Sequence, residues 1–210
     1  MDVQGLDRSA LIVVDVQNDF CPGGALAVPG GDEIIPIINS LMPLFGHVAL
    51  TQDWHPQGHS SFASTHGKAP FSLDEGPDRL GMLWPDHCVA GSRGADFHPG
   101  LRTDLARLIL RKGTRKDLDS YSAFFENDGH TSTGLSGWLA ALKVSAVYVL
   151  GLATDYCVRA TAVDAANLGL EVWVLTEACR PVSPQDERIA VEAMKSAGCS
   201  MASIYELRSR

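Results

Sequence analysis

Five short apolar segments, each rich in Val, Ile and Leu, constrain the fold of this chain more than any other feature. They lack strict alternation, which is typical of parallel strands that are covered on both faces. The segments cover residues 10–16, 47–52, 107–112, 144–151 and 171–176, and a weaker sixth strand is predicted at 200–207. Helical patterns lie between them, at residues 31–45, 131–143, 157–169 and 183–198. This alternation predicts an α/β fold, with a mostly parallel central sheet of about six strands and helices on both faces.

The length of the chain and one unusual stretch indicate how it is organised. Its 210 residues are enough for one sizeable core and too few for two full domains, so we expect a single domain over residues 1–210. Between residues 53 and 100, Gly, Pro, His, Ser and Asp crowd together and the hydrophobic periodicity vanishes. An unpatterned stretch of this length inside a compact domain is usually functional.

Charge and cysteine content exclude several classes of function. The net charge of −8 and the pI near 5.3 argue against a nucleic acid or an anionic membrane as partner. The first residues lack the basic region of a signal peptide, and no stretch approaches the about 20 apolar residues of a membrane helix. The five cysteines include no CxxC pair, which argues against a disulfide framework. We therefore expect a cytoplasmic protein.

Four chemically able residues lie at or after the carboxyl ends of the first four predicted strands. In open α/β sheets, ligands bind beyond the carboxyl ends of the strands. The residues at these ends are Asp15, Asp53, Lys112 and Cys157. Taken singly, Asp15 is better explained as a turn residue and Lys112 as a lysine that leaves the sheet. An ionised carboxylate after a buried strand is nevertheless costly unless it is paired or functional. Together the four residues favour a site.

The long loop adds residues that are able to bind a metal. Asp53 and His55 flank Trp54, so in an extended segment both point to the same side. Five of the seven histidines lie between residues 47 and 87, at positions 47, 55, 59, 66 and 87, and all but His47 are within the loop. Carboxylate and imidazole groups are ligands of zinc and similar divalent ions. The alternative is a polar surface loop whose histidines only form hydrogen bonds. The sequence does not select which three or four residues bind, and it leaves His59 and His66 open.

Cys157 lies where a strand–loop–helix turn places its sulfur at a helix amino terminus. Free N–H groups and the helix dipole stabilise a thiolate there and lower its pKa, and the same N–H groups are able to form an oxyanion hole. Asp155 is expected to cap this helix, with Thr154 as the weaker candidate. The alternative is a small core thiol, which is the commoner role for a free cysteine.

The chain resembles the nicotinamidase (pyrazinamidase) branch of the isochorismatase-like cysteine hydrolases. The matching segments are ALIVVDVQNDFCPGGALAVPGG, TQDWHPQGHSSFAS, LWPDHCVAGSRGADFHP, RKGTRKDLDSYSAF and GLATDYCVRATAVDAANLG. They occur in this order and extend the likeness from about Ser9 to Leu207. The combination is highly specific, although each segment alone is weak. The resemblance implies a Rossmann-like, three-layer fold.

The resemblance also assigns roles to individual residues. The matches to the catalytic residues of that branch are Asp15, Lys112 and Cys157. The matches to its metal ligands are Asp53, His55 and His87, and Ser60 matches a position that reaches the metal, usually through water. The oxyanion hole would be formed by the N–H groups of Ala153 and Cys157, with a cis peptide between Leu152 and Ala153. The aromatic walls that sandwich the substrate ring would be Phe20, Trp84 and Tyr121.

The implied activity is metal-dependent hydrolysis of nicotinamide to nicotinate and ammonia through a cysteine thioester, in NAD salvage. Pyrazinamide is expected as a second substrate. One divalent ion is expected, with Zn²⁺ as the first candidate and Fe²⁺ or Mn²⁺ as alternatives. The closest alternative activity is that of a related amidase acting on a carbamoyl or ureido compound, which would have no use for the metal ligands.

Two further alternatives are a binding protein without activity and a metallohydrolase in which Cys157 is only structural. The expected partner is a small molecule. The sequence does not decide whether the protein forms a homo-oligomer.

Overall fold

A six-stranded parallel sheet forms the centre of the computed structural model, which describes residues 6, 8–74 and 81–209. The strand order is β5-β2-β1-β6-β7-β8, and each neighbouring pair is parallel. The strands are β1 (Ser9–Val14), β2 (His47–Asp53), β5 (Leu108–Lys112), β6 (Ala146–Leu152), β7 (Glu171–Arg180) and β8 (Ser200–Ala202). The predicted α/β fold with a parallel sheet is confirmed.

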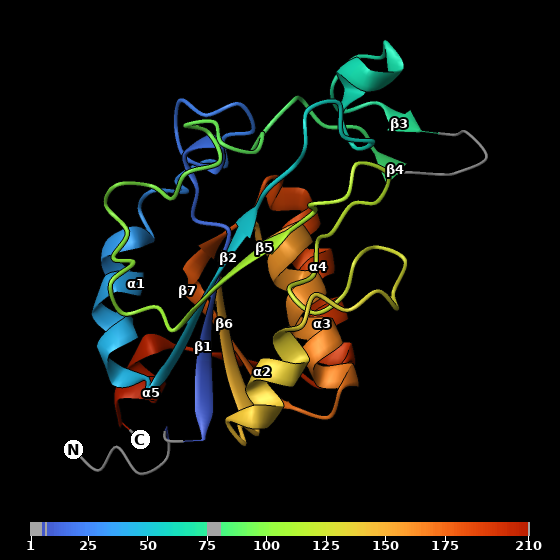
Figure 1. Cartoon of the computed structure of the whole chain (residues 1–210). Coiled ribbons are helices and arrows are strands. Elements are labelled where there is room, and N and C mark those ends of the chain that lie inside the picture. The colour runs from blue at the N-terminus through green and yellow to red at the C-terminus, as the bar shows by residue number, and fades with distance from the viewer. Residues whose placement is uncertain (1–5, 7, 75–80, 210) are drawn as a thin grey trace.

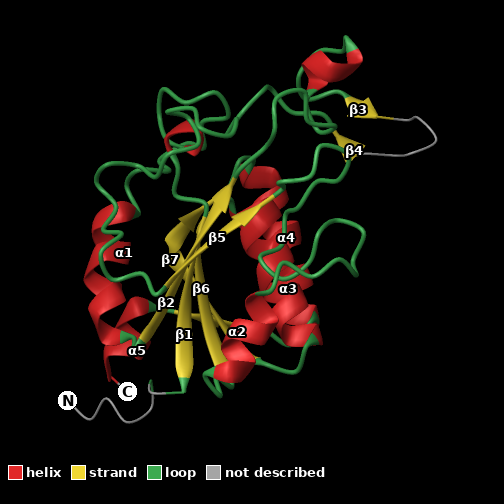
Figure 2. Ribbon diagram, in the orientation of Figure 1, coloured by secondary structure: helices red, strands yellow, loops and turns green. Residues whose placement is uncertain are grey.

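Helices cover both faces of the sheet, which gives three layers (Figures 1 and 2). On one face lie α1 (Ile35–Leu41) and α5 (Ile204–Ser209), and on the other lie α2 (Leu135–Ala141), α3 (Arg159–Asn167) and α4 (Pro184–Ser196). Short 3-10 helices span Asn18–Phe20, Met42–Leu44 and Ala63–His66, and a π-helix spans Thr154–Val158. In the described part of the chain, no helix combines the length and the apolar character needed to cross a membrane.

The burial of the strands explains their sequences. Every residue of β1 and β6 is buried, because each strand has neighbours on both sides and helices on both faces. Such strands read as continuous apolar runs rather than as alternating patterns. The edge strand β5 differs, since half-buried and exposed positions alternate along it and only Lys112 at its end is buried. A lysine buried at the end of an edge strand needs a partner of opposite charge.

The described residues of the long segment at 53–100 are ordered by a few short pairings above the carboxyl ends of the strands (Figure 1). The two-residue strands β3 (Leu73–Asp74) and β4 (Gly81–Met82) pair antiparallel. Isolated bridges join His55 to Val89 and Phe62 to Trp84. The sequence predicted no regular structure here because none of these pairings is long enough to impose a hydrophobic period.

Two predicted helices begin later than expected. The first begins at Ile35 with a proline in its first turn, and Pro43 shortens its end into the 3-10 helix Met42–Leu44. The second begins at Leu135, because Gly134 adopts a φ of 97°, which is incompatible with a helix. In both cases a residue of fixed or left-handed φ sets the boundary.

The carboxyl-terminal segment and the segment after β6 also differ from expectation. The strand predicted at 200–207 is confined to Ser200–Ala202, which pairs only with β7 at the edge of the sheet. The carboxylate of Glu177 accepts a hydrogen bond from the Ile204 N–H at 2.6 Å, and α5 begins there instead. The helix predicted to open at Cys157 is preceded by the π-helix, and α3 proper begins at Arg159.

Candidate active site

The structure brings together the four residues that stand at the strand ends. Asp15 follows β1 directly, Asp53 ends β2, Lys112 ends β5, and Cys157 lies in the π-helix that follows β6. These four strands are consecutive neighbours in the sheet, so their carboxyl ends lie side by side. All four residues are buried. We refer to Asp15, Lys112 and Cys157 as the nucleophile cluster.

The ammonium of Lys112 is the centre of this arrangement. Its Nζ lies 2.8 Å from Asp15 Oδ2, 2.5 Å from Asp53 Oδ1 and 3.5 Å from Cys157 Sγ. It also donates a hydrogen bond to the carbonyl oxygen of Ser120 at 2.9 Å. Burial alone would lower the pKa of Lys112, but Asp15 and Asp53 outweigh burial and raise it well above its usual value. Lys112 therefore stays charged at every physiological pH.

Asp15 is held in an environment that raises its proton affinity. Burial raises the pKa of Asp15 to about 6, against the opposing effect of Lys112. Thr51 Oγ1 donates a hydrogen bond of 2.6 Å to Asp15 Oδ1 and fixes the carboxylate. A carboxylate with a pKa near neutrality is suited to accept and return a proton.

The expected lowering of the Cys157 pKa is wrong. Burial raises the pKa of this thiol well above its usual value, and the nearby carboxylates of Asp15 and Asp53 add to the effect, while Lys112 opposes it. The sulfur lies inside a buried π-turn rather than at the open end of an α-helix. A thiol of this kind is not ionised beforehand, so it needs a base, and its hydrogen bond to Asp15 provides one.

A second group of side chains, Asp53, His55 and His87, is arranged as metal ligands would be. We refer to it as the ligand cluster. One ligand atom from each residue lies within 4.8 Å of the others. His55 Nε2 and His87 Nε2 lie 3.6 Å and 4.0 Å from Asp53 Oδ2. Burial lowers the pKa of His55, but Asp53 outweighs burial and raises it to about 9. The position between these side chains thus attracts positive charge.

The outer nitrogens of the two histidines fix which nitrogen faces the centre of the ligand cluster. His55 Nδ1 lies 2.9 Å from the carbonyl oxygen of Gly113, and His87 Nδ1 lies 2.8 Å from that of Pro85. A carbonyl only accepts hydrogen bonds, so each Nδ1 carries a hydrogen, and each Nε2, once deprotonated, is the nitrogen that presents a lone pair to an ion. Carbonyls commonly orient metal-ligating histidines in this way. The donor set and its orientation therefore fit a divalent ion.

Three further loop residues that the sequence singled out have different surroundings. The hydroxyl of Ser60 is buried, and within the described residues it has no hydrogen-bond partner. His59 stacks on the His55 ring with centroids 4.2 Å apart, and with Asp119 it forms an alternative ligand group around His55. His66 is exposed, bonds to the carbonyl oxygen of Ser60, and joins none of the ligand groups found in the described part of the chain.

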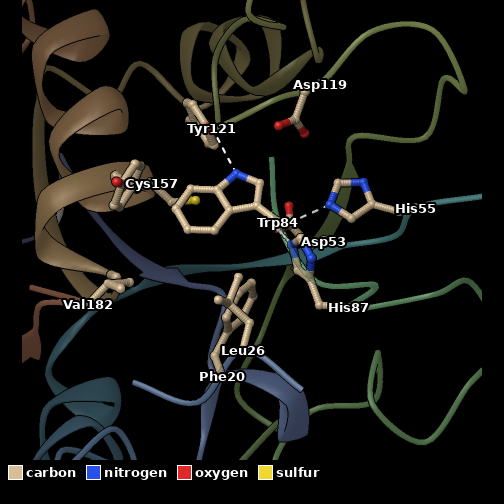
Figure 3. Close-up of a pocket in the computed structure, with 12 residues that line it drawn as sticks. Phe20, Leu26, Asp53, His55, Trp84, His87, Asp119, Tyr121, Cys157 and Val182 are labelled. Carbon is tan, nitrogen blue, oxygen red and sulfur yellow. Dashed lines mark hydrogen bonds and ion pairs between the residues drawn. The ribbon is translucent and has the colours of Figure 1, made fainter. Parts of the chain in front are cut away.

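The ligand cluster and Cys157 line one pocket with aromatic walls, of about 360 Å³ including its open mouth (Figure 3). Asp15 and Lys112 are buried and are not among its lining residues. Phe20, Trp84 and Tyr121, expected as substrate-binding residues, all line it. Trp84 Nε1 donates a hydrogen bond of 3.0 Å to Tyr121 Oη, which locks the two rings together. In Figure 3, Tyr121 and Asp119 point into the pocket from one side, and Phe20 and Leu26 from the opposite side. The hollow between the walls suits a flat ring.

Sequence reasoning missed four residues that line the pocket. They are Leu26, Asp119, Tyr156 and Val182. The ring centroids of Tyr156 and Trp84 are 4.8 Å apart and the rings are nearly perpendicular. The position of Tyr156 beside Cys157 in the sequence is the one signal that could have indicated it. Leu26 and Val182 are apolar loop residues, and nothing in their local sequence distinguishes them.

The turn that carries Cys157 has two further features. The peptide between Leu152 and Ala153 is cis, as the resemblance implied. The expected capping by Asp155 is wrong, because its two carboxylate oxygens accept hydrogen bonds of 2.9 Å from the N–H groups of Val182 and Ser183. Asp155 therefore ties the turn to the beginning of α4 and holds Val182 at the pocket.

Comparison with known proteins places this site in a family. The isochorismatase domain matches residues 9–206. The nicotinamidase of Acinetobacter baylyi is 53% identical over 177 residues, which are 84% of this chain and 83% of that protein. The nicotinamidase of Escherichia coli is 43% identical, over 94% of this chain and 95% of that protein.

Solved structures agree over nearly the whole chain. The Acinetobacter baumanii nicotinamidase/pyrazinamidase has a TM-score of 0.93 at 46% identity and covers 96% of this chain and 98% of its own. The pyrazinamidase of Pyrococcus horikoshii, solved in complex with zinc, has a TM-score of 0.78 at 40% identity and covers 94% of this chain and 99% of its own. The yeast nicotinamidase bound to the inhibitor nicotinaldehyde has a TM-score of 0.85 at 34% identity and covers 93% of this chain and 99% of its own. With the domain match and these identities, the chain belongs to the isochorismatase family.

Proposed function

We propose that this protein is a nicotinamidase that hydrolyses nicotinamide to nicotinate and ammonia through a thioester on Cys157. Pyrazinamide, in which a second ring nitrogen replaces a carbon, is proposed as a further substrate. The observation that carries the proposal is that Cys157, the pocket-lining member of the nucleophile cluster, and the ligand cluster line the same aromatic-walled pocket. Relatives at 43–53% identity are nicotinamidases, which supports the same activity here.

The nucleophile cluster would carry the bond-breaking steps. Asp15 accepts the thiol proton as the sulfur of Cys157 attacks the carboxamide carbon, and it then passes that proton to the departing ammonia. Lys112 stays protonated, holds Asp15 by their ion pair and stabilises the negative sulfur 3.5 Å away. A water molecule that loses a proton to Asp15 then attacks the thioester carbon. The C–S bond breaks, nicotinate is released, and Asp15 returns the proton to the Cys157 sulfur.

The turn at residues 152–158 would stabilise the oxygen of the tetrahedral intermediate. We assign this role to the backbone N–H groups of Ala153 and Cys157, as the resemblance implies. Ala153 and Cys157 both line the pocket. Preorganised N–H groups at an oxyanion typically contribute about 3–4 kcal/mol to transition-state stabilisation.

The aromatic walls and the ligand cluster would orient the substrate. Phe20, Trp84 and Tyr121 hold the pyridine ring by its faces and edges and exclude water. Asp53, His55 and His87 would hold the ion, and Ser60 would contact it through water. When bound, a divalent ion supplies a Lewis-acid centre for the ring nitrogen. The ligands suit Zn²⁺ first, with Fe²⁺ and Mn²⁺ as alternatives. A zinc-bound relative supports this order.

The alternative substrate, a carbamoyl or ureido amide, would use the nucleophile cluster alone. It gives no reason for two buried histidines whose Nε2 atoms face one carboxylate. The ligand cluster therefore favours nicotinamide. We further propose a role in NAD salvage in the cytoplasm, since all five cysteines are free and need no oxidising compartment.

The test is ammonia release by purified, Zn²⁺-loaded protein given nicotinamide or pyrazinamide. Mass spectrometry of quenched reactions is expected to show an acyl adduct on the peptide that contains Cys157. Hydrolysis of a ureido or carbamoyl amide, with no ammonia from nicotinamide or pyrazinamide, would replace the proposal by the alternative.

A further inference from the structure

Asp19 lies outside the pocket, yet its carboxylate binds two of the loops that build it. Oδ2 accepts a hydrogen bond of 2.7 Å from the backbone N–H of Cys88, and Oδ1 accepts one of 3.1 Å from that of Ala25. Asp19 is not among the residues that line the pocket. Its sequence neighbour Phe20 does line it, as does Leu26, whose N–H donates to the Asp19 carbonyl oxygen at 3.0 Å.

The hydrogen bond to Cys88 reaches both histidines of the ligand cluster. Cys88 directly follows His87, and its carbonyl oxygen accepts a hydrogen bond of 3.0 Å from the backbone N–H of His55. Cys88 also has a φ of 46°, a left-handed conformation that residues other than glycine adopt uncommonly. A backbone of this kind persists only when its surroundings hold it. The N–H that Asp19 accepts is the N–H of this same residue.

Asp19 is itself packed into a fixed position. Its N–H donates a hydrogen bond of 3.0 Å to the carbonyl oxygen of Gly94. A Cβ atom at Gly94 would overlap the Asp19 carboxylate, so the close approach requires glycine there. The Asp19 side chain therefore has little freedom to move away from Cys88.

We propose that Asp19 is a positioning residue that sets His55 and His87 in the geometry required by a divalent ion. This inference rests on the proposed function, because it concerns the ion that the ligand cluster would hold. Hydrogen bonds from backbone N–H groups to a carboxylate are about twice as strong as neutral ones. An asparagine at this position keeps the shape, loses the charge and has one acceptor oxygen in place of two, so one of the two loops is released.

The first experiment measures the affinity of metal-free Asp19→Asn protein for Zn²⁺ by competition with a chromophoric chelator. We expect it to bind at least about 10-fold more weakly than the wild type, as when outer partners of metal-ligating histidines are removed. Asp128→Asn is the matched control. Asp128 also accepts two backbone N–H groups, those of His130 and Thr131, but it does not line the pocket. Its Zn²⁺ affinity is expected to equal that of the wild type.

A second variant displaces the Asp19 carboxylate without changing its charge. Gly94→Ala introduces a methyl group where the carboxylate lies, and it is expected to weaken Zn²⁺ binding as Asp19→Asn does. Gly137→Ala is the control for this change, because a Cβ there meets open space in α2. The thermal unfolding temperature of each metal-free variant identifies the folded proteins.

Wild-type Zn²⁺ affinity in folded Asp19→Asn protein would overturn the proposal. If that variant does not fold, unchanged affinity in Gly94→Ala overturns it equally. If neither folds, Asp19 serves the whole fold and the proposal is wrong. The Zn²⁺ titration needs no turnover, so wild-type protein that binds Zn²⁺ but releases no ammonia would contradict the proposed function alone. Wild-type protein that does not bind Zn²⁺ would contradict both.

Discussion

The nucleophile cluster stands on strand ends, whereas two of the three residues of the ligand cluster stand on loops. Asp15, Lys112 and Cys157 follow or end neighbouring parallel strands. His55 and His87 lie in the segment above the sheet, and carbonyl groups orient their rings. The nucleophile cluster is held by the sheet and by its own ion pair, and the ligand cluster by hydrogen bonds between distant loops.

The difference indicates that the nucleophile cluster tolerates changes in the surrounding loops better than the ligand cluster does. Asp53 and Lys112 are partners in the register of β2 and β5, so the ladder itself sets their separation. No ladder sets the separation of His55 and His87, which depends on Cys88, Gly113 and Pro85. Asp53 of the ligand cluster also contacts the nucleophile cluster, because Oδ1 faces Lys112 and Oδ2 faces the histidines.

The largest expected effect comes from removing the sulfur of Cys157. Cys157→Ala should lower kcat/KM for nicotinamide by at least about 10⁴-fold, as loss of a nucleophile does in other hydrolases. The ligand cluster is untouched, so Zn²⁺ binding by the same chelator competition should be unchanged. Cys199→Ala, which alters another buried thiol, serves as the control. Substantial turnover by Cys157→Ala would make Cys157 structural and the protein a metallohydrolase.

Removing the metal ion should abolish the contribution of the ligand cluster to turnover. Dialysis against a chelator is expected to lower turnover by about 10²-fold or more, because the substrate ring loses its orientation. Added Zn²⁺ should restore the activity. Iodoacetamide should still modify Cys157 in the metal-free protein, since the nucleophile cluster does not depend on the ion. Activity that resists complete metal removal, checked by elemental analysis, would contradict the role of the ligand cluster.

The pH profile reports on Asp15, which must be ionised to accept the thiol proton. Its pKa is raised to about 6, so the base is present above that pH and is lost as the pH falls through it. Below about pH 6, log kcat/KM should fall by about one unit per pH unit. Initial rates in buffers of constant ionic strength test this. A profile that stays flat to well below pH 6 would show that Asp15 is not the base.

The smallest effect is expected at the pocket wall. Tyr156→Ala should raise the KM for nicotinamide by about 2–10-fold, the usual worth of one aromatic contact. Tyr156→Phe keeps the ring against Trp84 and should retain the wild-type KM. Steady-state kinetics of both variants separate ring packing from the hydroxyl. An equal rise in KM for Tyr156→Phe would assign the effect to the hydroxyl instead.

The sequence predicted the strand-end residues because their positions follow from a general property of parallel sheets. Once 10–16, 47–52, 107–112 and 144–151 are read as neighbouring parallel strands, the residues at or just after their carboxyl ends must gather at the same end of the sheet. The concentration of histidines between residues 47 and 87 was evident from the sequence. Choosing His87 over His59 or His66 as a ligand relied on the resemblance. Hydrogen bonds to remote carbonyls orient the selected rings, and no local pattern encodes them.

The errors arose where a distant segment supplied the deciding contact. Asp155 was read as the cap of its own helix, but its hydrogen-bond donors are Val182 and Ser183. The Cys157 pKa was expected to fall because a helix amino terminus is usually open to solvent. Here the turn is buried and faces two carboxylates, which no local sequence reveals. The carboxyl-terminal strand ended early because Glu177 on β7 captures the Ile204 N–H.

The pairing of β1 with β6 also bears on the order in which the molecule is assembled during synthesis. β1 is made before the other strands of the sheet, yet its partner on one side is separated from it by more than half the chain. Pairings of such long range form slowly. Until residues 146–152 emerge, β1 presents an open edge, and Asp15 is made long before Cys157. Catalytic competence therefore arises late in synthesis, and a chain that stops before β6 carries a base without its nucleophile.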